Sequence, residues 1–458
     1  MSTESAANMN EPLPPPDLAA EGDVNLSPLR RAWEAEHVGA ATRALLDADS
    51  EHFLRQSLST PCFNALKSCE GIWLEDVAGR RIMDFHGNNV HQVGYRHPHV
   101  IEAVKRALDT LPFSPRRFTN AAAIGLAAEL ARLAPQPLGK VLFAPGGTLA
   151  IGMALKLARL VTGRHKTLSL WDSFHGASLD AISIGGEAMF RKGMGPLLAG
   201  TEHAPPCDPL HCRFGCDAAC NLRCAEYLEY VLAKEEDIGA VIIETVRSTD
   251  VQVPPPEYYR IVRDACDRHG ALLILDEVPI CLGRTGRMFA FEHYDIVPDM
   301  VVLGKGLGGA LFPLAALIAR SDLDVAPDRS LGHYTHEKSS VGCAAALATL
   351  EVIERERLVE RSRTLGARAL QRLQTLKRKH SLVADVRGLG LLLGIELARD
   401  GRPAAREAEQ VMYECLARGL SFKVGQGNVL TLSPPLIIAS DDLDHALGII
   451  DAALGAVD

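Results

Sequence analysis

Short apolar runs alternate with helical patterns between residues 139 and 320 of this sequence. The runs are rich in valine, isoleucine and leucine and do not alternate with polar residues, so each predicts a strand buried on both faces. Strands of this kind, separated by helices, indicate a mostly parallel sheet covered on both sides, an α/β architecture. Ligands bind such sheets at the carboxyl ends of the strands. The predicted strands are KVLFA, TLSLW, GAVIIETV, ALLILDEV, MVVLGK and PLAALIA.

The segments on either side of this core predict a second, smaller lobe. Residues 71–85 are typical of a hairpin that turns at Ala78 and Gly79, and we expect it to join the smaller lobe and not the central sheet. Residues 99–111 predict an amphipathic packing helix. From about Val341, helices lead into a second αβ pattern. The expected boundaries are a disordered lead-in at 1–35, part of the small lobe at 36–90, a large domain at 91–335 and a C-terminal small domain at 336–458.

Composition narrows the class of protein. The 458-residue chain is 47% hydrophobic with a formal charge of −9, which argues against disorder and against a nucleic-acid-binding surface. No apolar run approaches the ~18 residues of a membrane helix, and the Pro-rich, acidic N-terminus does not resemble a signal peptide. Eleven cysteines are too few for a disulfide scaffold in so long a chain. We therefore expect a protein of the reducing cytoplasm that acts on a small substrate, without a membrane or nucleic-acid partner.

Five cysteines between Cys207 and Cys224 are a candidate metal site. Zinc sites usually join two ligands at short spacing with two distant ones, whereas the cysteines from Cys212 onward recur every fourth residue. That spacing equally suits four thiols on one helical face of a reduced, packed insert, so no metal is assigned. The run GKGLGG resembles a dinucleotide fingerprint. A strand follows it instead of a helix, which makes an NAD dehydrogenase a poor alternative.

Two predicted strands deliver an ionisable residue to the same edge of the sheet. Asp276 ends the apolar run ALLIL, and Lys305 follows the run MVVL. Burying a charged lysine costs free energy unless its amine has a chemical role. Binding a carbonyl cofactor would be such a role, because an amine forms an imine with a carbonyl group. The neighbouring glycines, Gly304 and Gly306, would give access to the amine. A solvent-exposed lysine with a capping aspartate explains these two runs about as well, so further features have to decide.

A second candidate feature is the segment PGGTLAIGMALKLAR, in which Gly147 and Thr148 open a predicted helix. Glycines at a helix start expose backbone N–H groups, and with the helix dipole and the Thr148 hydroxyl they would form a phosphate cradle. The segment lacks the Gly-Lys-Ser/Thr ending of a nucleotide P-loop, which argues against ATP. An ordinary glycine-rich turn is the alternative. Phe174 and His175 follow the strand TLSLW, where an aromatic ring could stack on a cofactor.

Taken together, these segments resemble the class-III aminotransferases, which are pyridoxal-phosphate (PLP) enzymes of fold type I, from about Gly71 to the C-terminus. The resemblance implies that Lys305 holds PLP as a Schiff base and later moves a proton, and that Asp276 pairs with the pyridine nitrogen. Thr335 would reach the phosphate in the partner subunit, so a homodimer would share its active sites. The other implied cofactor contacts are Gly147 and Thr148 at the phosphate, Phe174 on the ring, Val278 beneath it, and His175 and Glu244 nearby.

Several segments depart from the family pattern. The phosphate loop runs Gly-Gly-Thr-Leu-Ala where the family usually has Ser-Gly-Ser/Thr-Glu-Ala, and HEKSS replaces the usual Gly-Asn-Pro after Thr335. Four arginines lie in segments that match the active site, and their planar guanidinium groups suit the oxygens of a small anionic amine substrate. Ordinary surface positions explain them as well. The four are Arg116, Arg117, Arg247 and Arg387.

The sequence leaves the type of reaction open. The departures are most similar to the (R)-1-hydroxy-2-aminoethylphosphonate ammonia-lyase branch of the family, which implies a carbon-nitrogen lyase of phosphonate degradation. An aminotransferase that moves an amino group from a small amine to a keto acid is the alternative. A binding protein that kept the fold and lost its chemistry is a third, and Lys305, Asp276 and Thr148 argue against it because such a protein has no need of them.

Overall fold

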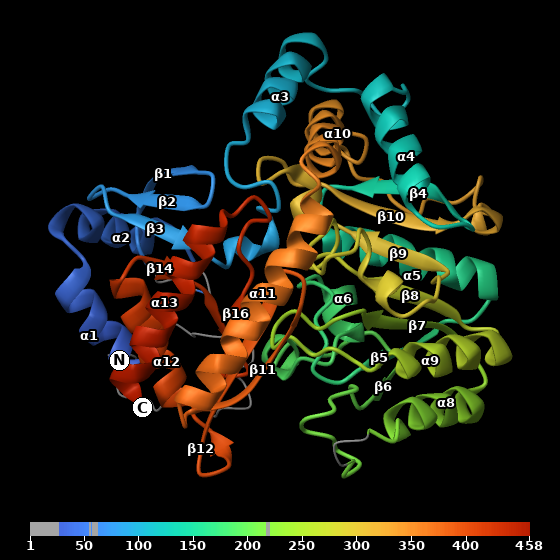
Figure 1. Cartoon of the computed structure of the whole chain (residues 1–458). Coiled ribbons are helices and arrows are strands. Elements are labelled where there is room, and N and C mark those ends of the chain that lie inside the picture. Colours follow the sequence, from blue (N-terminus) through green and yellow to red (C-terminus); the bar gives the residue numbers. More distant parts are fainter. Residues whose placement is uncertain (1–26, 55, 57–62, 217–219) are drawn as a thin grey trace, which may run out of the picture.

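The computed structural model describes residues 27–458 apart from residue 55, residues 57–62 and residues 217–219. Its largest sheet has seven strands, which run parallel except for β10, antiparallel to both of its neighbours. The mostly parallel sheet predicted from the apolar runs is therefore confirmed (Figure 1). In order across the sheet, the strands are β4 (Leu138–Ala144), β10 (Ala315–Arg320), β9 (Met300–Leu303), β8 (Leu272–Asp276), β7 (Ile238–Glu244), β5 (Lys166–Leu170) and β6 (Thr201–Ala204).

The strands of this sheet are apolar on both faces, as their sequences indicated. Along β7, Ala240 and Ile242 belong to the same core as helix α5 (Gly147–Thr162), whereas Val241 and Ile243 belong to the core on the opposite face. Successive side chains of a strand point to opposite faces, so helices on both sides require continuous apolar runs. The second core includes residues of α4 (Ala121–Leu133), α8 (Arg223–Glu235), α9 (Pro256–His269) and α10 (Ser340–Arg355).

The predicted amphipathic helix is α3 (Pro98–Thr110), and it packs against α10 through its apolar face. Short elements connect the longer ones in this part of the chain. They are η2 (Gly87–Asn89), α6 (Leu179–Ile184), α7 (Ala188–Arg191), η3 (Ala290–His293), η4 (Lys305–Gly308) and η5 (Ser321–Leu323). Among the described residues, every helix is too short or too polar to cross a bilayer.

The predicted hairpin is present. Strands β2 (Trp73–Asp76) and β3 (Arg81–Asp84) pair antiparallel, and Gly79 lies in the turn between them at a φ of 81°, which glycine adopts without strain. Strand β1 (Leu66–Glu70) extends this small sheet on one side, and β14 (Leu420–Ser421) pairs in parallel with β3 on the other. The hairpin therefore joins the C-terminal part of the chain and not the central sheet, as predicted.

Two helices precede the hairpin, α1 (Pro28–His37) and α2 (Ala40–His52). Helix α1 begins inside the segment predicted as a disordered lead-in, so that prediction extended too far. The Ser27 side chain caps the helix by accepting a hydrogen bond from the Arg30 N–H at 2.9 Å, and Trp33 stacks on Phe63 and Tyr413. Residues 1–26 of the predicted lead-in lie outside the described residues.

The C-terminal part builds a third sheet in the order β11-β12-β16-β15, with β13 beside β12. Helix α10, however, packs against α3 and α4 at the large sheet. The predicted boundary between residues 335 and 336 stays a prediction. The remaining C-terminal elements are α11 (Leu358–Lys379), β11 (Val383–Leu389), β12 (Leu392–Arg399), β13 (Arg402–Pro403), α12 (Ala405–Ala417), β15 (Lys423–Gly425), β16 (Val429–Leu432) and α13 (Ser440–Val457).

Candidate active site

Three neighbouring parallel strands of the large sheet carry a charged residue at or just beyond their ends. Glu244 ends β7 and Asp276 ends β8, and these two residues are partners in the strand register. Strand β9 ends at Leu303, and Lys305 follows as the first residue of η4. Because parallel strands point the same way, the three charged side chains meet at the carboxyl edge of the sheet, where ligands of such folds bind.

Asp276 is a buried carboxylate, only 3% exposed, with fixed partners. Its Oδ1 atom accepts a hydrogen bond from the Val278 N–H at 3.0 Å, and its Oδ2 atom lies 2.9 Å from Nδ1 of His175. The other ring nitrogen of His175 lies 3.3 Å from the Ser169 hydroxyl. A buried charge is tolerated only when it is paired, so this chain of contacts holds the carboxylate in one orientation. The contact between His175 and Asp276 was not predicted from the sequence.

Lys305 lies on an unusual backbone. Its φ of 45° is in the left-handed region, which residues other than glycine rarely adopt and which is common at functional sites. The next residue, Gly306, leaves room for the side chain of Gln92, because a Cβ atom there would lie 1.8 Å from its Oε1 atom. The turn thereby presents the Lys305 side chain to the cavity at the carboxyl edge of the sheet.

The predicted phosphate cradle lies at the start of α5. Gly146 is extended and Gly147 begins the helix, so backbone N–H groups of the first turn face the cavity. The Thr148 hydroxyl lies 2.7 Å from the hydroxyl of Ser178. Gly176 leaves room for the Thr148 side chain, because a Cβ atom at residue 176 would lie 2.3 Å from the Thr148 Oγ1 atom. Hydroxyls and N–H groups at a helix N-terminus suit a phosphate.

A cavity of about 730 Å³ joins these parts. The structure brings together at its wall all of the cofactor contacts that were predicted from the sequence except Thr335. Their roles toward a cofactor stay predictions. The residues are Gly147, Thr148, Phe174, His175, Glu244, Asp276, Val278 and Lys305.

Thr335 and two of the predicted arginines lie outside this cavity. Thr335 and Arg117 are exposed on the surface of the chain. Arg116 donates a hydrogen bond to Glu337 at 2.7 Å, and it lines a separate hollow beside α4 and α5. The contact of Thr335 with a partner subunit and the role of both arginines toward a substrate stay predictions.

The other two predicted arginines are held in ion pairs away from the cavity wall. Arg247 is buried, and its guanidinium pairs with Glu187 and Asp250, each at 3.1 Å. The guanidinium of Arg387 pairs with Glu396 at 2.7 Å and with Asp385 at 3.2 Å. Burial explains both arrangements, because a guanidinium that leaves water needs carboxylate or carbonyl partners. In the structure, both arginines therefore bind oxygens of the protein itself, whereas the sequence suggested that they bind oxygens of the substrate.

The cysteine-rich segment does not form the single helical face that the spacing allowed. Cys224 lies in α8, but this helix begins only at Arg223, because Leu222 before it adopts a φ of 59°. The described cysteines are free thiols, with Cys207 and Cys224 buried. Within the described part of the chain, no group of three or more histidine, cysteine or acidic side chains is arranged to hold a metal ion.

The groups around the main cavity fit PLP. The start of α5 suits a phosphate, a buried carboxylate suits a protonated ring nitrogen, and a lysine amine suits the aldehyde of the cofactor. Fold and site together define a PLP-dependent enzyme. The chain belongs to the class-III aminotransferase family, whose model matches residues 56–454.

Three individual proteins that are similar to this chain indicate which reactions its relatives catalyse. A (R)-1-hydroxy-2-aminoethylphosphonate ammonia-lyase of Vibrio splendidus (strain 12B01) is 51% identical, with 96% of this chain and 95% of that protein covered. An acetylornithine aminotransferase of Caldanaerobacter subterraneus subsp. tengcongensis is 33% identical, covering 85% and 94%. A PLP-bound amine transaminase from an uncultivated Pseudomonas species matches with a TM-score of 0.82 at 28% identity, over 89% of this chain and 99% of that one. The chain is therefore a PLP-dependent enzyme of the lyase or aminotransferase type.

Some residues at the cavity wall were not singled out from the sequence. Ser248 and Thr249 follow β7, and Lys423 begins β15 in the C-terminal part of the chain. The only sequence signal for Lys423 is a polar residue between Phe422 and Val424, a pattern that many half-exposed strands share. Which of such residues reaches the cavity depends on how the C-terminal sheet docks.

The buried carboxyl of Glu244 predicts a pH-dependent stability. Burial raises the pKa of Glu244 from its ordinary value of 4.5 to about 7. The folded protein then binds this proton more tightly than the unfolded chain does, so the free energy of unfolding falls as the pH rises from about 4.5 to about 7. In the cofactor-free protein, we expect this pH-dependent decrease in the free energy of unfolding to be smaller by roughly 1–3 kcal/mol in Glu244→Gln than in the wild type. Denaturant titrations of both proteins at pH 5 and pH 8 would measure it.

Burial also raises the pKa of Glu277 to about 7, so the wild-type protein has a second group with the same trend. Glu277 is present in both proteins, and its contribution cancels in the difference between them. Equal pH dependence of wild type and Glu244→Gln would contradict the prediction.

Proposed function

We propose that this protein is a PLP-dependent ammonia-lyase whose substrate is a small anionic amine, (R)-1-hydroxy-2-aminoethylphosphonate. The observation that carries the proposal is the 51% identity to the Vibrio lyase over nearly the whole of both chains. The acetylornithine aminotransferase reaches only 33%. This substrate carries a hydroxyl group and an amine on neighbouring carbons. Its net loss of ammonia leaves an aldehyde, so the reaction consumes no keto acid.

The residues at the cavity wall have the chemistry that this reaction needs. When bound, PLP withdraws electrons from the carbon that bears the substrate amine. The Lys305 amine would hold the cofactor and then take the proton from that carbon, as a positioned general base. Asp276, oriented by His175, would keep the proton on the ring nitrogen. The start of α5 and Thr148 would hold the phosphate group of the cofactor.

Lys423 is our candidate for binding the phosphonate group of the substrate. Three lysine or arginine side chains line the described cavity, namely Arg30, Lys305 and Lys423. Arg30 is buried in the N-terminal helix α1, and Lys305 would hold the cofactor. Lys423 lies on β15 of the C-terminal sheet, whereas Asp276 ends β8 of the large sheet and Lys305 follows β9 at the same carboxyl edge. A substrate between them would have its amine and its anionic group at opposite walls.

Replacing Lys423 with methionine should therefore weaken substrate binding and leave the chemical step in place. We expect KM to rise by about 10- to 100-fold, as for the loss of a charged hydrogen bond of ~1.5–3 kcal/mol, with a smaller change in kcat. Steady-state kinetics would measure both values. Lys234→Met, on the exposed side of α8, is the matched control and should change neither. An unchanged KM in Lys423→Met would remove this residue from the substrate site.

The function itself is tested by ammonia release from the hydroxylated aminoethylphosphonate by purified, PLP-loaded protein, with and without pyruvate. Ammonia without a keto acid is the expected result. Turnover only in the presence of pyruvate would refute the lyase and support the second candidate, a class-III aminotransferase, which the 33% identity to the acetylornithine enzyme favours.

We also propose that the active enzyme is a homodimer. Thr335 is exposed outside the cavity of its own chain, a position from which it could reach the site of a second copy. Sedimentation of the PLP-loaded protein would measure the state of assembly, and a monomer with full activity would contradict the proposal.

A further inference from the structure

The segment that follows β7, residues 245–252, forms one wall of the main cavity. Its residues Ser248 and Thr249 line the cavity, and an antiparallel bridge between Arg247 and Gln252 closes the segment into a loop. Val251 adopts a φ of 57°. A β-branched residue in this region is strained, so the surrounding structure has to hold the loop in its shape.

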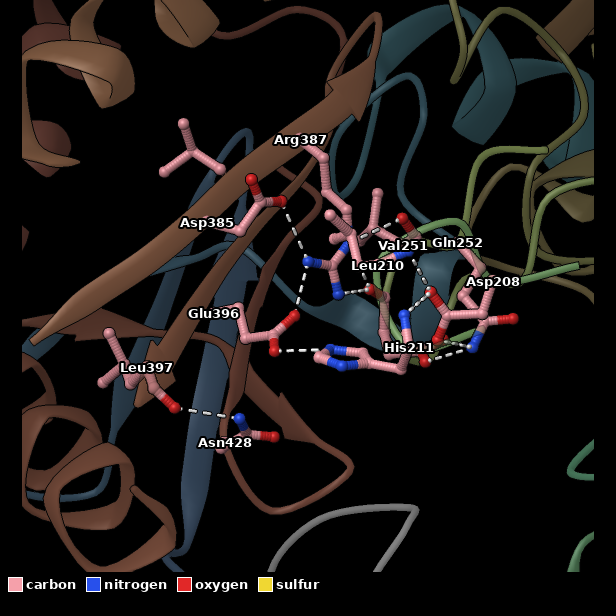
Figure 2. Close-up of polar contacts among 12 residues, drawn as sticks. Asp208, Leu210, His211, Val251, Gln252, Asp385, Arg387, Glu396, Leu397 and Asn428 are labelled. Carbon is pink, nitrogen blue, oxygen red and sulfur yellow. Dashed lines mark hydrogen bonds and ion pairs between the residues drawn. The ribbon is translucent and has the colours of Figure 1, made fainter. Parts of the chain in front are cut away.

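Arg387 of β11 holds this loop from the C-terminal sheet. Its Nε atom donates to the carbonyl oxygens of Asp250 at 3.2 Å and of Val251 at 3.1 Å, and its Nη2 atom donates to the Asp250 carbonyl at 2.8 Å. The remaining Nη1 atom pairs with Asp385 and Glu396. Figure 2 shows the guanidinium between these carboxylates and the loop. Every nitrogen of the guanidinium therefore has a protein oxygen as partner.

Two neighbouring strands reinforce the contact. The Thr431 hydroxyl donates to the carbonyl oxygen of Thr249 at 2.8 Å. Gly425 lets the backbones approach, because a Cβ atom there would lie 1.8 Å from that same oxygen. Three successive carbonyl groups of the loop, from Thr249 to Val251, are thus bound by the C-terminal sheet.

The arginine is itself oriented by its acidic partners. Glu396 is 6% exposed, and its second oxygen lies 2.7 Å from Nε2 of His211, in the segment between β6 and α8 (Figure 2). Within the loop itself, the guanidinium of Arg247 pairs with Asp250 and with Glu187. The loop is therefore held by Arg387 from the C-terminal sheet and by the ion pairs of its own Arg247.

We propose that Arg387 is a positioning residue, which holds the strained loop so that Ser248 and Thr249 present their hydroxyl groups to the anionic group of the substrate. Lysine could not replace it, because a single ammonium group cannot reach two carbonyls and two carboxylates at once. The inference rests on the proposed function for the identity of the substrate and is independent of whether the reaction is a lyase or an aminotransferase reaction.

The test is a double-mutant cycle on the PLP-loaded protein. Its readout is the dissociation constant of 2-hydroxyethylphosphonate, an analogue without an amine that cannot react, measured by calorimetry. We expect Arg387→Lys to weaken binding by about tenfold or more. In the background of Ser248→Ala with Thr249→Val, the same change should weaken binding by less than about twofold, because the hydroxyls that it positions are gone. The visible absorbance of bound PLP should stay unchanged in all variants, since Lys305 and Asp276 lie at the carboxyl edge of the large sheet, away from the substituted residues in sequence.

Arg399→Lys is the matched control, because Arg399 pairs with Glu407 at the exposed end of β12, and binding should be unchanged. Thr431→Val, which loses one donor to the loop and keeps its shape, should weaken binding in the same direction even if Arg387→Lys folds poorly. Equal weakening in both backgrounds, or wild-type affinity in Arg387→Lys and Thr431→Val, would overturn the proposal, as would a wild-type protein that does not bind the analogue. A wild-type protein that binds the analogue but releases no ammonia from (R)-1-hydroxy-2-aminoethylphosphonate would refute only the proposed lyase function.

Discussion

Replacing Lys305 with alanine is expected to abolish turnover and the visible absorbance of the protein together. The amine is the only group of this side chain that can bond to the aldehyde of PLP, and the same amine would move the proton during the reaction. We expect the rate to fall by about 10²–10⁴-fold, the range for the loss of a positioned acid-base group, with a further loss from weaker cofactor retention. Ammonia release and an absorption spectrum of the dialysed protein would measure both effects.

Lys234→Ala is a suitable control for that experiment. Lys234 is an exposed residue of α8 that lies over the ring of Tyr230, and its removal should change neither the rate nor the spectrum. Retention of visible absorbance after dialysis of Lys305→Ala would show that another amine holds the cofactor. The left-handed backbone of Lys305 would then have to be explained in another way.

Asp276→Asn is expected to have the second-largest effect, and a different one. Asparagine keeps the size of the side chain but has no charge to hold a proton on the pyridine nitrogen, so bound PLP would lose most of its capacity to withdraw electrons. It would also leave His175 without its carboxylate partner at 2.9 Å. We expect kcat to fall by about 10²–10⁴-fold, as for the loss of a buried charge pair of ~3–5 kcal/mol, with Lys305 still able to hold the cofactor.

The split between cofactor retention and turnover distinguishes the two residues. Asp276→Asn should keep visible absorbance after dialysis, while Lys305→Ala should not. Asp328→Asn, at an exposed ion pair with Arg329, is the matched control for loss of a carboxylate. A rate within about threefold of wild type in Asp276→Asn would contradict the role of this carboxylate at the ring nitrogen.

Much of the fold could be read from the apolar pattern. Continuous runs such as VIIE and LLILD predicted strands buried on both faces, and β7 and β8 do contribute alternate residues to two separate cores. The hairpin at residues 73–84 was also predictable, because its two strands and the turn between them are adjacent in sequence. The extent of the lead-in was not, since α1 depends on the stacking of Trp33 with Phe63 and Tyr413, and Tyr413 comes from far along the chain.

The residues at the strand ends could be identified from the amino-acid sequence alone. Asp276 and Lys305 reach one cavity because parallel strands place their carboxyl ends at one edge, and Thr148 does so because a helix start follows β4 directly. Each position follows from local chain direction. The partners of the charged residues between the two sheets, in contrast, became evident only from the three-dimensional packing. Arg247 and Arg387 face carbonyls and carboxylates of their own chain, and Lys423 faces the cavity, because the partner of a long cationic side chain depends on which surface is docked against it and not on its neighbours in sequence.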